Sequence, residues 1–172
     1  MELSGKWVDY DEPFVRRRYN RIARYFVLFE WLFLMPRGIR RKAVDRLELK
    51  EGASVLEIGC GTGRNLALLV EAVGPEGRVY GVDLSEGMLA KAEELRTQSG
   101  WRNVTLARSD AASYDAPEHV DGVIFSLSYA VMPNHREVLR RAWEQLSPGG
   151  RLVIMDAKLP SGPVGKLLHP FV

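Results

Sequence analysis

The chain has 172 residues, 46% of them hydrophobic and 27% charged, and a net charge of +2. This length suits one domain, and the composition is that of a globular protein. The only cysteine, Cys60, excludes an internal disulfide and favours a reducing compartment. The polar start excludes a signal peptide, and the most apolar run, residues 25–36, is shorter than a membrane span and contains Glu30. We therefore expect a cytoplasmic protein.

The first 50 residues form a basic segment, with 12 Lys or Arg against 7 Asp or Glu, whereas the remainder carries 12 against 15. Such a segment could contact an anionic substrate or a membrane surface, or could be a solvated helix face. We predict two helices, over residues 14–34 and 36–49. Their aromatic side chains favour a lid over the sheet's carboxyl edge, with core packing as the alternative. These aromatics are Tyr19, Tyr25, Phe26, Phe29, Trp31 and Phe33.

Short apolar runs alternate with amphipathic segments after residue 53. The runs predict strands over residues 54–58, 78–84, 103–110, 120–128 and 151–157. The segments between them predict helices over residues 64–73, 86–100 and 133–146, the second of them capped by Ser85. This order indicates an α/β, Rossmann-like, doubly wound and mainly parallel sheet with helices on both faces.

Three regions follow from this pattern: a helical lid segment (1–50), the sheet domain (51–158) and a Pro/Gly-rich tail (159–172). The sequence "SPGG", residues 147–150, is predicted to be a turn before the fifth strand. A sheet that stops at this strand has an unpaired edge, which a second copy of the chain could cover.

The stretch "VLEIGCGTGRN", residues 55–65, places Gly59, Gly61 and Gly63 directly after the first strand. In an open parallel sheet, ligands bind beyond the strands' carboxyl ends, and a turn without Cβ atoms lets a ligand approach the backbone. The following helix directs its N-terminus at the same place, which favours an anionic group. Dinucleotides and S-adenosylmethionine are both bound at such turns.

Two residues favour S-adenosylmethionine. Arg64 stands where the third small residue of the dinucleotide fingerprint should fall. Glu57 precedes the first glycine, where its charge would oppose a pyrophosphate but suits an ammonium group. Asp83, at the end of the second strand, could accept hydrogen bonds from ribose hydroxyls of either cofactor. Cys60 is a small residue fitting the bend or a reactive thiol.

Asp110 follows the third strand, where a carboxylate could accept from an adenine amino group or cap its own turn. Five motifs follow one another along the chain: "VLEIGCGTGRN", "GVDLSEGML", "RSDAASYD", "VDGVIFSLSYAV" and "LSPGGRLVIMD". Together they resemble the successive motifs of class I S-adenosylmethionine-dependent methyltransferases, over about residues 50–157.

The resemblance implies a cofactor site for S-adenosylmethionine, with S-adenosylhomocysteine as product. Glu57 and the glycines would hold the methionine portion, Asp83 the ribose, and Asp110 with Ala111 the adenine edge. Leu84 or Met88 would line the adenine ring, and Ser126 would present its backbone near the methyl donor. The cofactor-binding set implied is Tyr19, Glu57, Gly59, Cys60, Gly61, Gly63, Asn65, Asp83, Leu84, Met88, Asp110, Ala111 and Ser126.

The N-terminal "YNRIARYFVLFEWL" resembles the lead-in of methyltransferases acting on quinones, phospholipids and other small molecules. Tyr19 and Tyr25 occupy its tyrosine positions, whereas Asn20 and Phe26 replace its usual aspartates. This resemblance implies a small or lipid-like acceptor and allows peripheral membrane contact. The family's sheet has two further strands, so a truncated or naturally short member is expected.

Methyl transfer is an in-line displacement that requires positioning and exclusion of water, with a general base only for some acceptors. No catalytic dyad is evident, and Tyr129 is the candidate acceptor-facing residue. Members of the resembled family that methylate amino groups of nucleobases usually carry an Asp/Asn-Pro-Pro-aromatic motif after the fourth strand. This chain has none there, so the resemblance disfavours a nucleic-acid acceptor. The alternatives are a cofactor-binding module without activity and a nicotinamide-dependent oxidoreductase.

Overall fold

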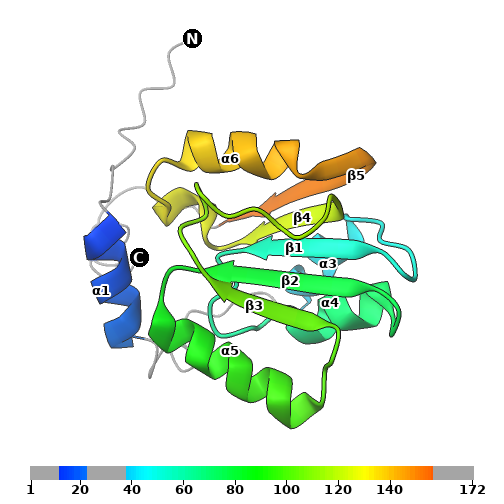
Figure 1. Ribbon diagram of the computed structural model, residues 1–172, viewed down its shortest axis with the longest axis horizontal. Coiled ribbons are helices and arrows are strands. Elements are labelled where there is room, and N and C mark those ends of the chain that lie inside the picture. Colours follow the sequence, from blue (N-terminus) through cyan, green and yellow to red (C-terminus); the bar gives the residue numbers. More distant parts are fainter. Residues whose placement is uncertain (1–11, 23–37, 157–172) are drawn as a thin grey trace.

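Five parallel strands form one sheet in the order β3-β2-β1-β4-β5. The computed structural model describes residues 12–22 and 38–156 (Figure 1). The strands are β1 (Ser54–Ile58), β2 (Arg78–Asp83), β3 (Val104–Arg108), β4 (Val120–Ser126) and β5 (Leu146–Met155). The helices are α1 (Glu12–Ile22), α3 (Ile39–Asp45), α4 (Leu66–Val73), α5 (Glu86–Ser99), α6 (His135–Glu144) and the 3-10 helix η1 (Tyr129–Val131).

The strand order confirms the predicted Rossmann-like, doubly wound sheet. The chain winds outward from β1 to β3, then crosses back to place β4 on the other side of β1. β1 and β4 therefore flank the point at which the winding direction reverses, and ligands bind at such a point. The glycine turn begins at Gly59, directly after β1, and thus lies at this position.

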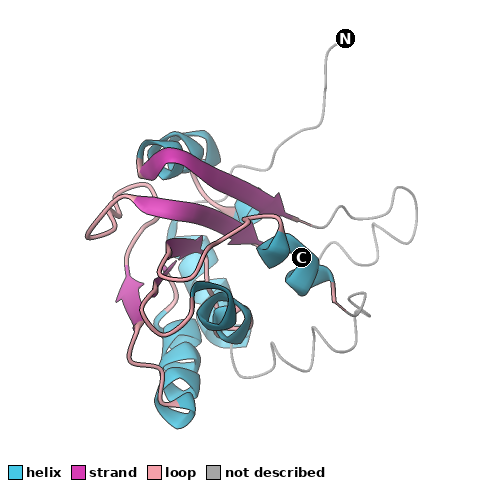
Figure 2. Cartoon of the chain, turned by 90° about the vertical axis from the view of Figure 1, so that its right-hand side faces the viewer, coloured by secondary structure: helices cyan, strands magenta, loops and turns pink. Residues whose placement is uncertain are grey.

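Helices cover both faces of the sheet (Figure 2). One core is formed by the face of β1 that carries Val55, together with α3, α4 and α5. The other is formed by the face that carries Leu56 and Ile58, together with α6. Residues 109–119 connect β3 to β4 without a helix, and Tyr114 from this connection packs on the same side as α6. The two covered faces leave the strand ends as the place for a ligand.

The last strand differs from its prediction, because β5 begins at Leu146 and the expected turn of residues 147–150 lies within it. Leu146 pairs with Val120, and the next paired residue is Arg151, opposite Gly122. The extra residues of β5 are accommodated as an irregularity, with Gly149 at φ 85°. β5 pairs with β4 both before and after residues 147–150. The Pro and Gly of this stretch therefore interrupt the register without ending the strand.

At the N-terminus, α1 covers the first part of the predicted helix over residues 14–34. It lies beyond the carboxyl ends of the strands (Figure 1). Tyr25, Phe26, Phe29, Trp31 and Phe33 lie outside the described residues, as does the tail 159–172. The second predicted helix, 36–49, corresponds to the shorter α3. Of the helices in residues 12–22 and 38–156, none is long and apolar enough to cross a membrane.

Candidate functional site

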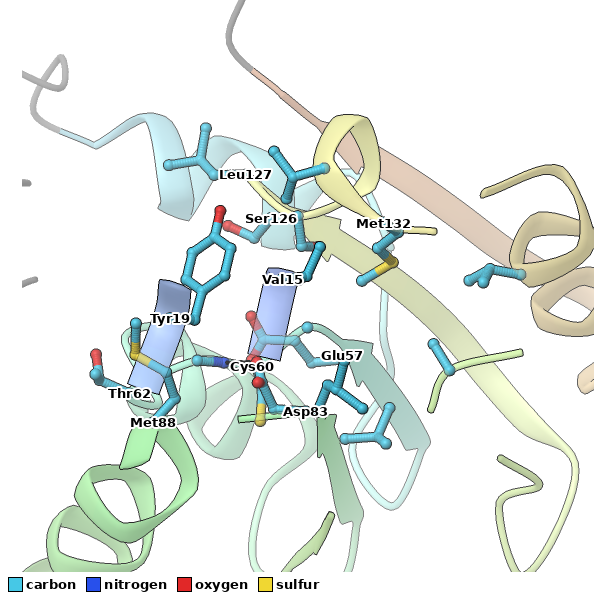
Figure 3. Close-up of a pocket in the computed structure, with 18 of the residues that line it drawn as sticks. Val15, Tyr19, Glu57, Cys60, Thr62, Asp83, Met88, Ser126, Leu127 and Met132 are labelled. Carbon is cyan, nitrogen blue, oxygen red and sulfur yellow. Dashed lines mark hydrogen bonds between the residues drawn. The ribbon is translucent and has the colours of Figure 1, made fainter. Parts of the chain in front are cut away.

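A cavity with about 860 Å³ of empty volume, including its open mouth, lies at the carboxyl ends of β1, β2 and β4. Val15 and Tyr19 of α1 line it opposite the strand ends (Figure 3). All but two of the predicted cofactor-binding residues line this cavity. Those that do are Tyr19, Glu57, Gly59, Cys60, Gly61, Asp83, Leu84, Met88, Asp110, Ala111 and Ser126.

The three glycines of the turn have different roles, although all have positive φ. A Cβ on Gly59 would lie 2.5 Å from the Cβ of Ser128, so this glycine allows the loop after β4 to approach. A Cβ on Gly63 would lie 2.7 Å from Leu66 Cδ1, so this glycine allows packing against α4. A Cβ on Gly61 would meet nothing within 4 Å. At Gly61, no packing contact requires the missing side chain, so beyond its positive φ this glycine leaves room for a ligand on the turn.

Glu57 is buried at the end of β1 with only one of its carboxyl oxygens bonded. Glu57 is 2% exposed, and its Oε1 accepts a 2.6 Å hydrogen bond from Nδ2 of Asn65. Burial raises the pKa of Glu57 to about 8, against the opposing effects of Asn65 and Arg40. Asn65, a predicted cofactor-binding residue, does not line the cavity but contacts Glu57, which does.

Two buried polar atoms at the cavity have no hydrogen-bond partner within the described part of the chain. They are Oε2 of Glu57 and Oγ1 of Thr62, which is 5% exposed. A buried polar group without a partner is costly and is rare in native proteins. Both residues line the cavity, so a ligand there could supply the missing partners.

Arg40, on α3, was missed by the sequence prediction. Its Nη1 donates to Oδ1 of Asn65 at 3.1 Å and to Oγ of Ser126 at 2.8 Å. The guanidinium thus joins the loop before α4 to the end of β4, across the switch point of the sheet. No local pattern could identify it, because its partners lie 25 and 86 residues away in the chain.

Asp83 ties the glycine turn to the start of α5. Its Oδ2 accepts from the backbone N–H of Gly61 and its Oδ1 from that of Ser85, both at 2.8 Å. Burial raises the pKa of Asp83 above its usual value despite these hydrogen bonds. Figure 3 shows Asp83 close to Glu57 at the cavity wall. The predicted ribose contact would use the remaining acceptor capacity of this carboxylate.

Asp110, Cys60 and Met88 each have a structural role in addition to the predicted one. Asp110 lines the cavity, and its Oδ1 also accepts from the backbone N–H of Ala112 at 3.0 Å, which is the turn cap foreseen as its alternative role. The thiol of Cys60 is buried, and burial raises its pKa, so the geometry favours the packing interpretation. Met88 is buried, and its N–H donates to Ser85 Oγ, the predicted helix cap.

The candidate acceptor-facing residue, Tyr129, lies in η1 beside the cavity. Its ring packs edge-on against Phe125, at 5.4 Å between ring centroids, and against His135, at 5.5 Å. Among the described residues, the cavity lining on this side includes Val131 and Met132 but not Tyr129. Its proposed contact with an acceptor stays a prediction.

Asn20 connects α1 to the sheet domain. Its Oδ1 accepts from the Ser85 hydroxyl at 2.7 Å and from the Gly87 N–H at 3.0 Å. The amide oxygen thereby serves the N-terminus of α5, where a carboxylate oxygen would also be favourable. This contact joins α1 to the start of α5, and α1 also carries Tyr19 and Val15, which line the cavity.

Comparison with known proteins agrees with this geometry. The sequence profile of a family described as "Methyltransferase domain" matches residues 49–167. A demethylmenaquinone methyltransferase of Listeria monocytogenes is 32% identical over 147 residues, covering 85% of this chain and 59% of the relative. The chain spans about three fifths of the length of such relatives, 65% and 59% for the first two.

Solved structures show the same fold. A SAM-dependent methyltransferase from Aquifex aeolicus superposes with a TM-score of 0.67 at 23% identity, covering 91% of this chain and 80% of that one. One from Thiobacillus denitrificans, in complex with S-adenosyl-L-homocysteine, gives 0.62 at 26% identity, covering 78% and 55%. Since the family profile covers more than half of the sequence, the chain belongs to the methyltransferase domain family, of the class I, Rossmann-like type.

Proposed function

We propose that this chain binds S-adenosylmethionine in the cavity and transfers its methyl group to a small, quinone-like or lipid-like acceptor. The observation that carries the proposal is Oε2 of Glu57, a buried carboxyl oxygen without a partner among the described residues, in a side chain that lines the cavity. An ammonium group would satisfy it, directly or through one water.

The rest of the cavity fits the same cofactor. Asp83 offers acceptors to ribose hydroxyls, and Gly61 leaves its side of the turn open. Leu84 and Met88 give an apolar wall that suits the adenine ring, next to Asp110. A pyrophosphate would instead face two buried carboxyl groups, Glu57 and Asp83, which argues against the nicotinamide-dependent alternative.

The acceptor proposal is supported by the apolar part of the lining and by the demethylmenaquinone methyltransferases that the chain resembles. Leu127, Val131 and Met132 line the cavity from the β4 side, and Val15 and Tyr19 from α1. When bound, the cofactor supplies a methyl carbon already activated by its sulfonium. The chain's own residues then have to orient the two ligands and exclude water.

Calorimetric titration tests the cofactor part of the proposal. We expect S-adenosylhomocysteine to bind with one-to-one stoichiometry and NAD not to bind. Binding of NAD alone would overturn the assignment and favour an oxidoreductase.

Methyl transfer to a demethylated quinone analogue separates an enzyme from a cofactor-binding module. We expect release of S-adenosylhomocysteine that depends on the quinone analogue. Tight cofactor binding with no transfer, in a chain extended to the length of its relatives, would favour the module.

We also propose contact between α1 and an anionic membrane surface, in a protein of the cytoplasm. Arg16, Arg17 and Arg21 are exposed on this helix, and Phe14 is 42% exposed. Co-sedimentation with anionic vesicles, but not with zwitterionic ones, is the expected result. Loss of binding in Arg17→Glu/Arg21→Glu would locate the contact, whereas unchanged binding in this variant would contradict it.

A dimer through the edge of β5 is a separate proposal, supported by Ile154, which is 41% exposed on that strand. Solution scattering should give a dimer mass, and Ile154→Lys should give a monomer. A monomer for the unchanged chain would contradict the proposal.

A further inference from the structure

We propose that Arg40 is a positioning residue, which orients Glu57 and favours its charged form so that the carboxylate can receive a ligand's ammonium group. This inference rests on the proposed binding of S-adenosylmethionine and assigns a role to a residue outside the glycine turn. It is carried by a chain of hydrogen bonds across the switch point of the sheet.

The hydrogen bonds run from α3 to the cavity through one amide. Arg40 Nη1 donates to Oδ1 of Asn65, so the Nδ2 of the same amide faces the other way, toward Oε1 of Glu57. An amide can present its oxygen or its nitrogen to a carboxylate, and only the nitrogen is favourable. A guanidinium on the oxygen side therefore fixes the orientation that Glu57 needs. With Oε1 held in this way, the other carboxyl oxygen, Oε2, is the one left for a ligand.

A second hydrogen bond holds the guanidinium itself. Arg40 Nη1 donates to Oγ of Ser126, at the end of β4, at 2.8 Å. Ser126 is buried and lines the cavity. Arg40 is thus fixed to the end of β4 as well as to the loop before α4, through both hydrogens of a single guanidinium nitrogen.

The charge balance around Glu57 depends on Arg40. The charged or titratable groups that act on its carboxyl or are acted on by it are Arg40 from α3, Asp83 from β2 and the thiol of Cys60. Arg40 lowers the pKa of Glu57, whereas burial and Asp83 raise it. Arg40 is therefore the cation that opposes protonation of a carboxyl which burial makes partly neutral near neutral pH.

The pH dependence of S-adenosylhomocysteine binding tests this role. The ligand's ammonium prefers the ionised carboxylate, so the affinity of the unchanged protein should rise with pH as Glu57 ionises, toward about pH 8. Arg40→Met removes the opposing cation, so the rise should move to higher pH. Below both midpoints, the affinity should fall about tenfold for each unit by which the pKa increases.

A neighbouring arginine supplies the matched control. Arg41, also on α3, pairs with Glu71 in an exposed ion pair at 2.7 Å, away from the cavity lining. Arg41→Met should leave both the affinity and its pH profile unchanged. The ligand's own amine titrates identically in every sample, so the shift between variants reports on the protein.

The Glu57→Gln background separates positioning from simple loss of structure. In that background, Arg40→Met should no longer move the pH profile, because the titrating carboxyl is absent. In the chain that keeps Glu57, Arg40→Lys should move the pH profile less than Arg40→Met does, since lysine keeps a positive charge. A uniform loss of affinity at every pH, with no shift, would overturn the proposal. If the unchanged chain binds no S-adenosylhomocysteine at all, the proposed function itself has failed.

Discussion

A glutamate lies at each end of the sheet, and the environments of the two carboxyl groups differ. At the amino end, Glu118 accepts from the hydroxyls of Ser54 and Tyr80, both at 2.8 Å, and pairs with Arg78 at 3.2 Å. At the carboxyl end, Glu57 has one bonded oxygen and one buried oxygen without a partner among the described residues. Hydrogen bonds lower the pKa of Glu118, whereas burial raises that of Glu57. A carboxylate that stabilises the fold is fully bonded, and one that serves a ligand retains unmet capacity.

The largest expected effect is on the pH dependence of stability. The pKa of Glu57 is raised from 4.5 to about 8 in the folded chain. The folded state therefore holds a proton that the unfolded state has lost, so stability should fall as pH rises from about 4.5 to about 8 and then level off. Relative to Glu57→Gln, the unfolding free energy should fall by about 1.4 kcal/mol per pH unit in this window. Urea unfolding of both proteins at several pH values measures it.

Glu118→Gln should show the opposite sign. Its pKa is lowered on folding, so its contribution is present above its unfolded pKa and is lost as pH falls. The difference from the unchanged chain should therefore shrink on acidification. Because its side chain is 37% exposed, the effect should be smaller than that of Glu57. The same sign for both glutamates would remove the contrast between the two ends of the sheet.

The next largest effect is on ligand affinity, which should fall in Glu57→Gln but not in Glu118→Gln. Removing a charge-assisted hydrogen bond typically costs about 1.5–3 kcal/mol, so Glu57→Gln should weaken S-adenosylhomocysteine binding about 10- to 150-fold above pH 8. Glu118→Gln should change the affinity less than about twofold, because it lies at the other end of the strands. Titration calorimetry on both variants provides the test. Equal losses would show that folding, and not the carboxylate itself, determines binding.

Two glycines extend the comparison to smaller effects. A Cβ on Gly77, at the amino end, would lie 2.5 Å from the backbone oxygen of Val73, so Gly77→Ala should destabilise the fold by about 1–3 kcal/mol. A Cβ on Gly61 would meet no protein atom, although its φ of +55° adds about 1 kcal/mol of strain. Gly61→Ala should therefore impair ligand binding more than stability, as melting curves with and without ligand would show. A larger loss of stability from Gly61→Ala would contradict this assignment.

The smallest expected effect concerns α1. Asn20→Asp keeps an acceptor for Ser85 and Gly87 and adds negative charge at the N-terminus of α5, which should stabilise the contact by about 0.3–1 kcal/mol. Asn20→Ala should release α1 and speed its cleavage by a protease. Equal protease sensitivity of both variants would rule out this contact as the anchor of α1.

Local patterns in the sequence predicted most of the sheet and much of the cavity. The alternation of apolar runs placed all five strands, and the glycine turn with Asp83 and Asp110 placed the carboxyl-end site, because these signals lie within or directly after single elements. Ser85 was correctly predicted to cap α5. The residue-by-residue roles of this set toward a cofactor stay predictions.

What the sequence could not provide are contacts between distant segments. Arg40 acts through Asn65 and Ser126, and Gly59 is required by the approach of Ser128, so neither role has a local signature. The start of β5 was missed because pairing of Leu146 with Val120 overrides the turn signal of "SPGG". Such features emerge only when the sheet brings its strands together.

A crystal structure with S-adenosylhomocysteine bound tests the central claim most directly. It should place the ligand's amino nitrogen about 3 Å from Oε2 of Glu57, or joined to it by one water, with Arg40 still on Asn65. A ligand whose amino group lies elsewhere, leaving Oε2 without a partner, would contradict the account.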